Sequence, residues 1–140
     1  MRQILLFAAL AASLALLSGC MLSKTKADTA EDMAGKAAYH KISAEEAYEM
    51  MASQEVMVVD VRTREEYDGG HIENAVLVPN ESIGSETPEA LPDKEATLLV
   101  YCRSGRRSKD AAQKLLALGY QSVYDFGGII DWPYELVKEG

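Results

Sequence analysis

Short apolar runs alternate with polar and amphipathic segments along most of the chain. Residues 56–61 (VMVVDV) and 96–101 (ATLLVY) are almost continuously apolar, which is typical of strands buried on both faces of a parallel sheet. The pattern predicts five strands, at residues 39–42, 56–61, 75–78, 96–101 and 122–126. Segments of helical character separate most of these strands. We therefore expect an α/β fold: an open, mainly parallel five-stranded sheet with helices on both faces.

Two pairs of polar residues mark where helices begin. Ser43 with Glu46, and Thr63 with Glu66, have the spacing of a capping box. The first pair predicts a helix from residue 44 to about residue 54. The second predicts a short helix that stops at the glycines 69–70.

Three further helical segments are expected in the second half of the chain. Ser108 is expected to cap a helix with an apolar face that ends at Gly119. A short helix is expected near Glu89, inside the turn-rich segment 80–94. A last helical segment is expected to contain Trp132, after the chain turns at two glycines.

The first twenty residues differ from the rest. Arg2 precedes an uncharged apolar run at residues 4–17, whose length suits a secretory signal rather than a membrane-spanning helix. The run ends in LSGC, which resembles the lipobox of bacterial lipoproteins. That resemblance implies cleavage before Cys20 and a lipid on its sulfur. The alternative is an ordinary secretory signal followed by a chance cysteine.

These patterns divide the chain into three parts. We expect a lipoprotein signal peptide at residues 1–19, a lipidated cysteine and flexible tether at residues 20–38, and one folded domain at residues 39–140. The expected location is extracytoplasmic, anchored by lipid to a bacterial membrane. The net charge of -8 argues against a nucleic-acid partner and against electrostatic binding to anionic lipid, so we expect the lipid anchor to be the sole membrane contact.

Cys102 is the chain's candidate reactive group. The sequence has two cysteines, so lipidation of Cys20 would leave Cys102 as the only thiol, without a disulfide partner. His40 and His71 are far apart in the sequence, and no ligand cluster indicates a metal site. We expect neither a metal nor a cofactor.

The residues after Cys102 favour an anionic sulfur. Cys102 lies in the stretch YCRSGRRS at residues 101–108, between a predicted strand and a predicted helix. Gly105 can adopt the positive φ that a tight loop needs, and successive N–H groups can then form an anion-binding nest. Together with the helix N-terminus, such a nest can lower the pKa of a thiol from ~8.5 to ~3.5–7.5. Three arginines add positive charge: Arg103, Arg106 and Arg107.

Four motifs, in order and at these spacings, are similar to single-domain members of the rhodanese family, and the similarity covers residues 39–140. The motifs are DVR at residues 60–62 with EEY at 65–67, GHI at 70–72 with Ala75, YCRSGRRS at 101–108, and GGI at 127–129 before Trp132.

The resemblance implies a sulfurtransferase. Cys102 would attack the outer sulfur of thiosulfate, release sulfite and keep a persulfide, which then passes to cyanide or a thiol. The N–H groups of the loop, including those of Ser104 and Gly105, would cradle the terminal sulfur. Arg103, Arg106 and Arg107 would be candidates to bind the anionic sulfur donor.

The remaining motif residues are interpreted as structural. We expect Asp60 and Arg62 to pair or to cap a strand end, His71 to make a structural hydrogen bond, and Trp132 to pack against the sheet.

Two rival functions remain open. Cysteine phosphatases and arsenate reductases of the rhodanese fold have a loop one residue longer, with an arginine six positions after the cysteine. Ser108 occupies that position here, which favours sulfur over phosphate. The other rival is a binding module without catalysis, although such modules often lack the loop cysteine.

Overall fold

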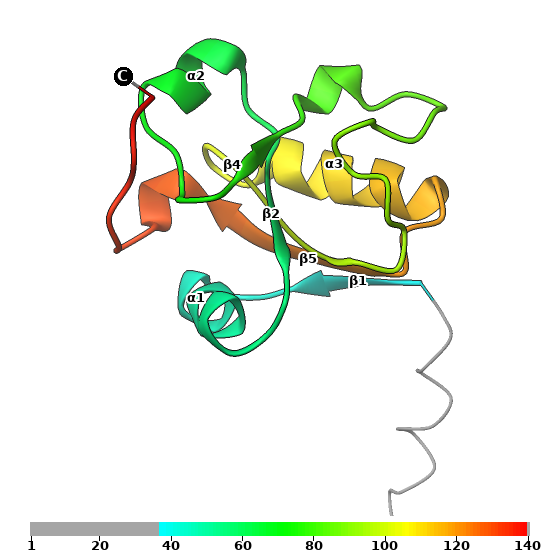
Figure 1. The fold of residues 1–140 in the computed structure, drawn as a ribbon, viewed down its shortest axis with the longest axis horizontal. Coiled ribbons are helices and arrows are strands. Elements are labelled where there is room, and N and C mark those ends of the chain that lie inside the picture. The colour runs from blue at the N-terminus through cyan, green and yellow to red at the C-terminus, as the bar shows by residue number, and fades with distance from the viewer. Residues whose placement is uncertain (1–36, 140) are drawn as a thin grey trace, which may run out of the picture.

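The computed structural model describes residues 37–139, which form a parallel five-stranded sheet with helices on both faces (Figure 1). The strands are β1 (Ala38–Lys41), β2 (Met57–Asp60), β3 (Val76–Leu77), β4 (Thr97–Cys102) and β5 (Ser122–Gly128). Their order is β1-β5-β4-β2-β3, and all neighbouring pairs are parallel. The predicted fold class and all five predicted strands are confirmed. Because β4 is the central strand, its carboxyl end lies between those of β2 and β5.

Alternate residues of β4 pack into two separate cores. Leu98 and Val100 face α3 (Arg106–Ala117), whose Leu115 lies in the same apolar cluster. Leu99 and Tyr101 face the opposite side, in the cluster that contains Ala47 of α1 (Ala44–Ser53) and Tyr67 of α2 (Arg64–Asp68). The period-2 alternation of strand side chains thus places helices on both faces of the sheet.

Both predicted capping boxes form. The Ser43 hydroxyl accepts a hydrogen bond from the Glu46 N–H at 3.1 Å, and the Glu46 carboxylate accepts one from the Ser43 N–H at 2.7 Å. Thr63 and Glu66 repeat this arrangement at the start of α2. Gly119 follows the end of α3 with φ 98°, as predicted.

The structure corrects three predicted helix positions. α3 begins at Arg106, directly after Gly105, and Ser108 does not cap it. The Ser108 hydroxyl instead donates a hydrogen bond to the carboxylate of Asp125. The short helix expected near Glu89 lies earlier, as the 3-10 helix η1 (Asn80–Ser82). The last helical segment is the 3-10 helix η2 (Ile129–Asp131), which ends just before Trp132.

The predicted signal peptide, Cys20 and most of the predicted tether lie outside the described residues. Within residues 37–139, no helix has the length and apolar character needed to cross a membrane.

Candidate active site

The cysteine loop, residues 102–107, connects the last residue of β4 to the first turn of α3. Cys102 is in register with Gly128 of β5 and is only 1% exposed. The sequence predicted that arginines surround Cys102. In the structure the Cys102 side chain instead lies in an apolar cluster, and its sulfur faces backbone N–H groups. The site is therefore a buried sulfur held by the main chain.

Backbone N–H groups converge on the sulfur of Cys102. The Gly105 N–H donates to Sγ at 3.0 Å, and Gly105 has the predicted positive φ, 103°. Burial raises the pKa of the thiol, but hydrogen bonds from the N–H groups of Ser108, Gly105 and Ser104 outweigh it and hold the pKa below the ordinary thiol value. The loop thus lowers the pKa of Cys102, which is the direction that the nest argument predicted.

Two glycines of β5 allow the cysteine loop to pack closely on the sheet. A Cβ on Gly128 would lie 2.3 Å from the Arg103 carbonyl oxygen, which is closer than any real contact. Gly127 has φ 89°, a conformation that L side chains rarely adopt. The Ile130 N–H then donates to the Arg103 carbonyl at 3.3 Å. The end of β5 therefore fixes the shape of the cysteine loop.

A buried carboxylate, Asp125, joins α3 to the sheet beneath the cysteine loop. Its Oδ1 accepts from the Ser108 hydroxyl at 2.7 Å and from the Gly127 N–H at 2.9 Å, and its Oδ2 accepts from the Tyr39 hydroxyl at 2.8 Å. Burial, together with the hydrogen bond to Asp125 and the charge of that carboxylate, raises the pKa of Tyr39 to about 12. The sequence reasoning missed Asp125. A charged residue inside an apolar strand was the available signal, because a buried charge requires partners.

The three loop arginines have different surroundings. Both terminal nitrogens of Arg107 donate hydrogen bonds to the Glu66 carboxylate, at 2.8 and 2.9 Å. This ion pair links α2 to α3 across the site. Arg106 is exposed at the first position of α3, and Arg103 is exposed in the loop itself. The sequence analysis recognised Glu66 only as a capping residue, because its partner lies 41 positions away.

An open hollow of about 370 Å³ adjoins the cysteine loop. Its lining includes the polar residues Arg62, Glu65, Glu66 and Arg103. Apolar residues of the C-terminal segment complete it, among them Ile130 and Leu136.

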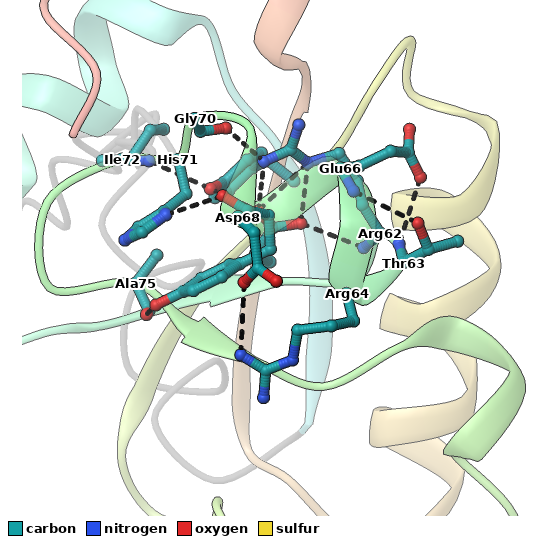
Figure 2. A network of polar contacts seen from close by, with 12 residues as sticks. Arg62, Thr63, Arg64, Glu66, Asp68, Gly70, His71, Ile72 and Ala75 are labelled. Atoms are coloured by element: carbon teal, nitrogen blue, oxygen red, sulfur yellow. Dashed lines mark hydrogen bonds and ion pairs between the residues drawn. The ribbon is translucent and has the colours of Figure 1, made fainter. Parts of the chain in front are cut away.

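Arg62, which lines this hollow, lies in a network of polar contacts (Figure 2). Arg62 donates to both carboxylate oxygens of Asp60, with the shortest contact at 2.6 Å, and to the Gly70 carbonyl at 2.8 Å. The Tyr101 hydroxyl donates to Asp60 at 2.7 Å and accepts from the Ile72 N–H at 3.1 Å. The predicted Asp60–Arg62 pair is confirmed.

Two other structural interpretations are also confirmed. His71 stacks on Tyr67, and its Nδ1 lies 2.9 Å from the Tyr67 carbonyl oxygen. Trp132 packs against the sheet beside Phe126, at a ring-centroid distance of 5.6 Å.

Comparisons with known proteins agree with the fold. The rhodanese-like domain family matches residues 43–133. The chain resembles the structure of "rhodanese with anions" from E. coli, with a TM-score of 0.56 and 34% identity over 61% of this chain and all of that one. It also resembles a rhodanese-like domain protein from Staphylococcus aureus, with a TM-score of 0.62 and 31% identity over 72% of this chain and 99% of that one. The human single-domain sulfurtransferase has a TM-score of 0.59 and 26% identity, over 66% and 93% of the two chains.

Curated relatives include the tRNA uridine(34) hydroxylase of Yersinia pestis, which is 32% identical over 106 residues. The match covers 72% of this chain but only 30% of the hydroxylase. The chain thus spans less than a third of the length of that relative.

Proposed function

Since the chain belongs to the rhodanese-like domain family, we propose that it is a sulfurtransferase that carries sulfane sulfur as a persulfide on Cys102. The observation that carries this proposal is the set of backbone N–H groups that stabilise the sulfur, with that of Gly105 donating at 3.0 Å. The same donors that favour a thiolate can stabilise the anionic outer sulfur of a persulfide. No separate general base is then required near Cys102.

The reaction consists of two displacements at sulfur. In the first, the Cys102 thiolate attacks the outer sulfur of thiosulfate, the sulfur–sulfur bond of thiosulfate breaks, and its electron pair leaves with sulfite. In the second, cyanide or a thiolate attacks the outer sulfur of the persulfide, and the electron pair of the broken bond returns to Sγ. Each displacement conserves charge and needs no external oxidant.

The loop arginines would attract the anionic donor. Arg103 and Arg106 are exposed, while the charge of Arg107 is largely balanced by Glu66. We propose that Arg103 and Arg106 bind the sulfonate oxygens, and that Arg107 contributes mainly by positioning the loop. A hydrogen bond to a charged group contributes about 1.5–3 kcal/mol, so each direct contact would matter for the capture of thiosulfate.

The residue six positions after the cysteine supports this function over a phosphatase or an arsenate reductase. That residue, Ser108, is fully buried and donates its hydroxyl to Asp125. It therefore offers no cation to an oxyanion in the loop. We do not extend the hydroxylase activity of the curated relatives to this chain, because the match covers only 30% of their length.

We also propose that the protein acts outside the cytoplasm as a lipoprotein. This rests on the LSGC motif, which directly follows the apolar run of residues 4–17. A diacylglycerol on Cys20 would hold the domain near the membrane through the segment that follows it.

The test of the sulfurtransferase is the intact mass of the protein after incubation with thiosulfate. We expect one added sulfur on the wild type and none on Cys102→Ser, together with loss of thiosulfate:cyanide activity in that variant. Circular dichroism should show that the variant keeps its fold, because serine is nearly isosteric with cysteine. Retention of activity by Cys102→Ser would exclude the mechanism.

A further inference from the structure

The buried carboxylate beneath the cysteine loop collects donors from three elements. Asp125 is 1% exposed, and both of its oxygens accept hydrogen bonds. Oδ1 accepts from the Ser108 hydroxyl of α3 and from the Gly127 N–H of β5, and Oδ2 accepts from the Tyr39 hydroxyl of β1. The Lys41 ammonium, also of β1, lies 3.4 Å from Oδ1. Three elements thus meet at this one side chain.

The negative charge of Asp125 is not needed to satisfy these donors. An asparagine would accept from Gly127 and Ser108 through its oxygen, and its amide nitrogen could donate to the Tyr39 hydroxyl. Burying a charge costs more free energy than burying a hydrogen-bonded amide. A negative charge beneath the cysteine loop also opposes the anionic sulfur that the loop stabilises. The charge therefore calls for a reason beyond the packing of the fold.

The Ser108 hydroxyl connects Asp125 to the surroundings of the sulfur. Its oxygen lies 3.1 Å from the carbonyl of Gly105, the residue whose N–H donates to Sγ of Cys102. Burial has the largest influence on the pKa of the Cys102 thiol and raises it, and the Ser108 hydroxyl is among the groups that lower it. Asp125 and the sulfur are thus both within reach of the same hydroxyl.

That hydroxyl has a single proton to donate. Its nearest acceptor is Oδ1 of Asp125, at 2.7 Å, while the carbonyl oxygens of Gly105 and Gly127 lie at 3.1 and 3.3 Å. A charged acceptor also forms the stronger hydrogen bond. The proton therefore points at Asp125, and the Ser108 hydroxyl has none left for the sulfur.

We propose that Asp125 is a positioning residue that holds the Ser108 proton away from the sulfur of Cys102, so that the thiolate keeps its nucleophilic strength. The inference rests on the proposed sulfurtransferase function and adds a residue to it. A thiolate attacks more slowly as it becomes more stabilised, but it also leaves more easily. Asp125 thus favours the first displacement, in which Cys102 attacks, over the second, in which Cys102 leaves.

The first test is the pH profile of alkylation at Cys102 by iodoacetamide, an uncharged reagent, followed by peptide mass. The full-length protein, purified in detergent, is compared with Asp125→Asn, which keeps the shape and removes the charge. The midpoint should move to lower pH in the variant, because the Ser108 proton becomes available to the thiolate. Well below the midpoint, alkylation should be about two- to fivefold faster, and on the plateau about two- to threefold slower. An unchanged or higher midpoint, as expected if Asp125 only supports the loop, would overturn the proposal.

Ser108→Ala separates the route through the hydroxyl from the direct effect of the charge. Removing a hydroxyl whose proton already belongs to Asp125 should hardly move the midpoint, whereas removing one that donates to the sulfur would raise it clearly. That rise would overturn the proposal even if Asp125→Asn did not fold. In the double variant, Asp125→Asn should lower the midpoint less than it does alone. Equal shifts with and without the hydroxyl would exclude the route through Ser108.

Tyr39→Phe is the matched control for a loosened network. It removes a donor from Oδ2 of Asp125 but leaves the charge and Ser108 in place, so it should not lower the midpoint. The other charges around the pair are unchanged in every variant: Lys41 beside Asp125, and Arg107, whose charge interacts with Cys102. A fall as large as that of Asp125→Asn would identify loosening as the cause and exclude the proposal.

The second test compares the two displacements at a pH above both midpoints. Intact mass follows the formation of the persulfide from thiosulfate and then its loss to cyanide. Asp125→Asn should raise the ratio of the second rate to the first by about three- to tenfold. Removing a negative charge would by itself attract the doubly charged thiosulfate more than cyanide and so lower this ratio. A ratio that is unchanged or lower would contradict the proposal.

The two tests also distinguish this proposal from the proposed function. If the wild type acquires no persulfide, the sulfurtransferase proposal fails, and the alkylation profiles still decide whether Asp125 holds the Ser108 proton away from the sulfur. If the persulfide forms but the profiles show no fall in the midpoint, only the role of Asp125 is overturned.

Discussion

At the scale of single residues, the sulfur of Cys102 depends on main-chain donors rather than on a neighbouring base. Its burial alone would favour the neutral thiol, yet N–H groups of Ser108, Gly105 and Ser104 reverse that preference. A buried thiolate can also select reagents by size. Small donors that fit the loop would reach the sulfur, and bulky ones would not.

We expect the alkylation of Cys102 by iodoacetamide to reach half its maximal rate at a pH below ~8.5, the ordinary thiol pKa. Because the folded-state pKa is lowered, ionisation adds stability as pH rises from the folded pKa to the unfolded one, and that contribution is lost as pH falls through the folded value. The measurement is the alkylation rate against pH, beside thermal melts of the wild type and Cys102→Ser. A half-maximal rate at or above the ordinary value would show that the N–H groups do not stabilise the thiolate.

At the scale of elements, Glu66 connects the start of α2 to the start of α3. Hydrogen bonds from Arg107 lower the pKa of the Glu66 carboxyl to about 2, against burial, and the N–H of Thr63 adds to the effect. The stability from this depressed pKa is complete above the ordinary glutamate value of ~4.3 and is lost as pH falls through about 2.

Glu66→Gln should therefore lower the free energy of unfolding by about 1–2 kcal/mol near neutral pH. The loss should be smaller in acid, because the wild-type carboxylate then begins to be protonated. Glutamine can still form the capping box, so the helix cap is kept. Glu46→Gln is the matched control, because Glu46 makes the same capping contact in α1 and has no arginine partner among residues 37–139. Urea unfolding of both variants at neutral and acid pH measures the difference. Equal losses in the two variants would mean that the ion pair adds nothing beyond the cap.

The contact between β5 and the cysteine loop is a second connection between elements. Gly128→Ala would place a Cβ 2.3 Å from the Arg103 carbonyl oxygen. We expect a loss of about 1–3 kcal/mol in the free energy of unfolding, together with a rise in the pKa of Cys102 as the loop shifts. Gly84→Ala, at a position with open space around it, should change neither quantity much. Denaturant unfolding and thiol alkylation provide the two measurements, and an unperturbed Gly128→Ala protein would contradict the close packing.

Local signals explain which parts of the fold and site were predictable from sequence. The capping boxes of Ser43 and Thr63 and the left-handed Gly105 depend on residues within a few positions, and all were found. Ser108 was misassigned as a cap because its partner, Asp125, lies 17 positions away. The Arg107–Glu66 pair spans 41 positions, and no local pattern reveals it.

At the scale of the whole molecule, we expect the folded domain and the proposed lipid anchor to function separately. We predict that Cys20→Ala leaves the protein uncleaved at its lipobox or releases it from membranes, while its thiosulfate:cyanide activity is retained. The motivation is the LSGC motif, which lies in a part of the chain remote from Cys102. Membrane fractionation and mass spectrometry of Cys20 provide the check, and an unmodified Cys20 in the mature wild-type protein would refute lipidation.

The position of β5 has a consequence for biosynthesis. β5 is the last strand of the sheet to be synthesised, yet it supplies Asp125, Gly127 and Gly128, which hold the cysteine loop in shape. In a growing chain that still lacks β5, nothing from that strand holds the cysteine loop in shape, so we expect Cys102 to keep the protonation of an ordinary thiol. We therefore expect Cys102 to become reactive only after β5 has joined the sheet.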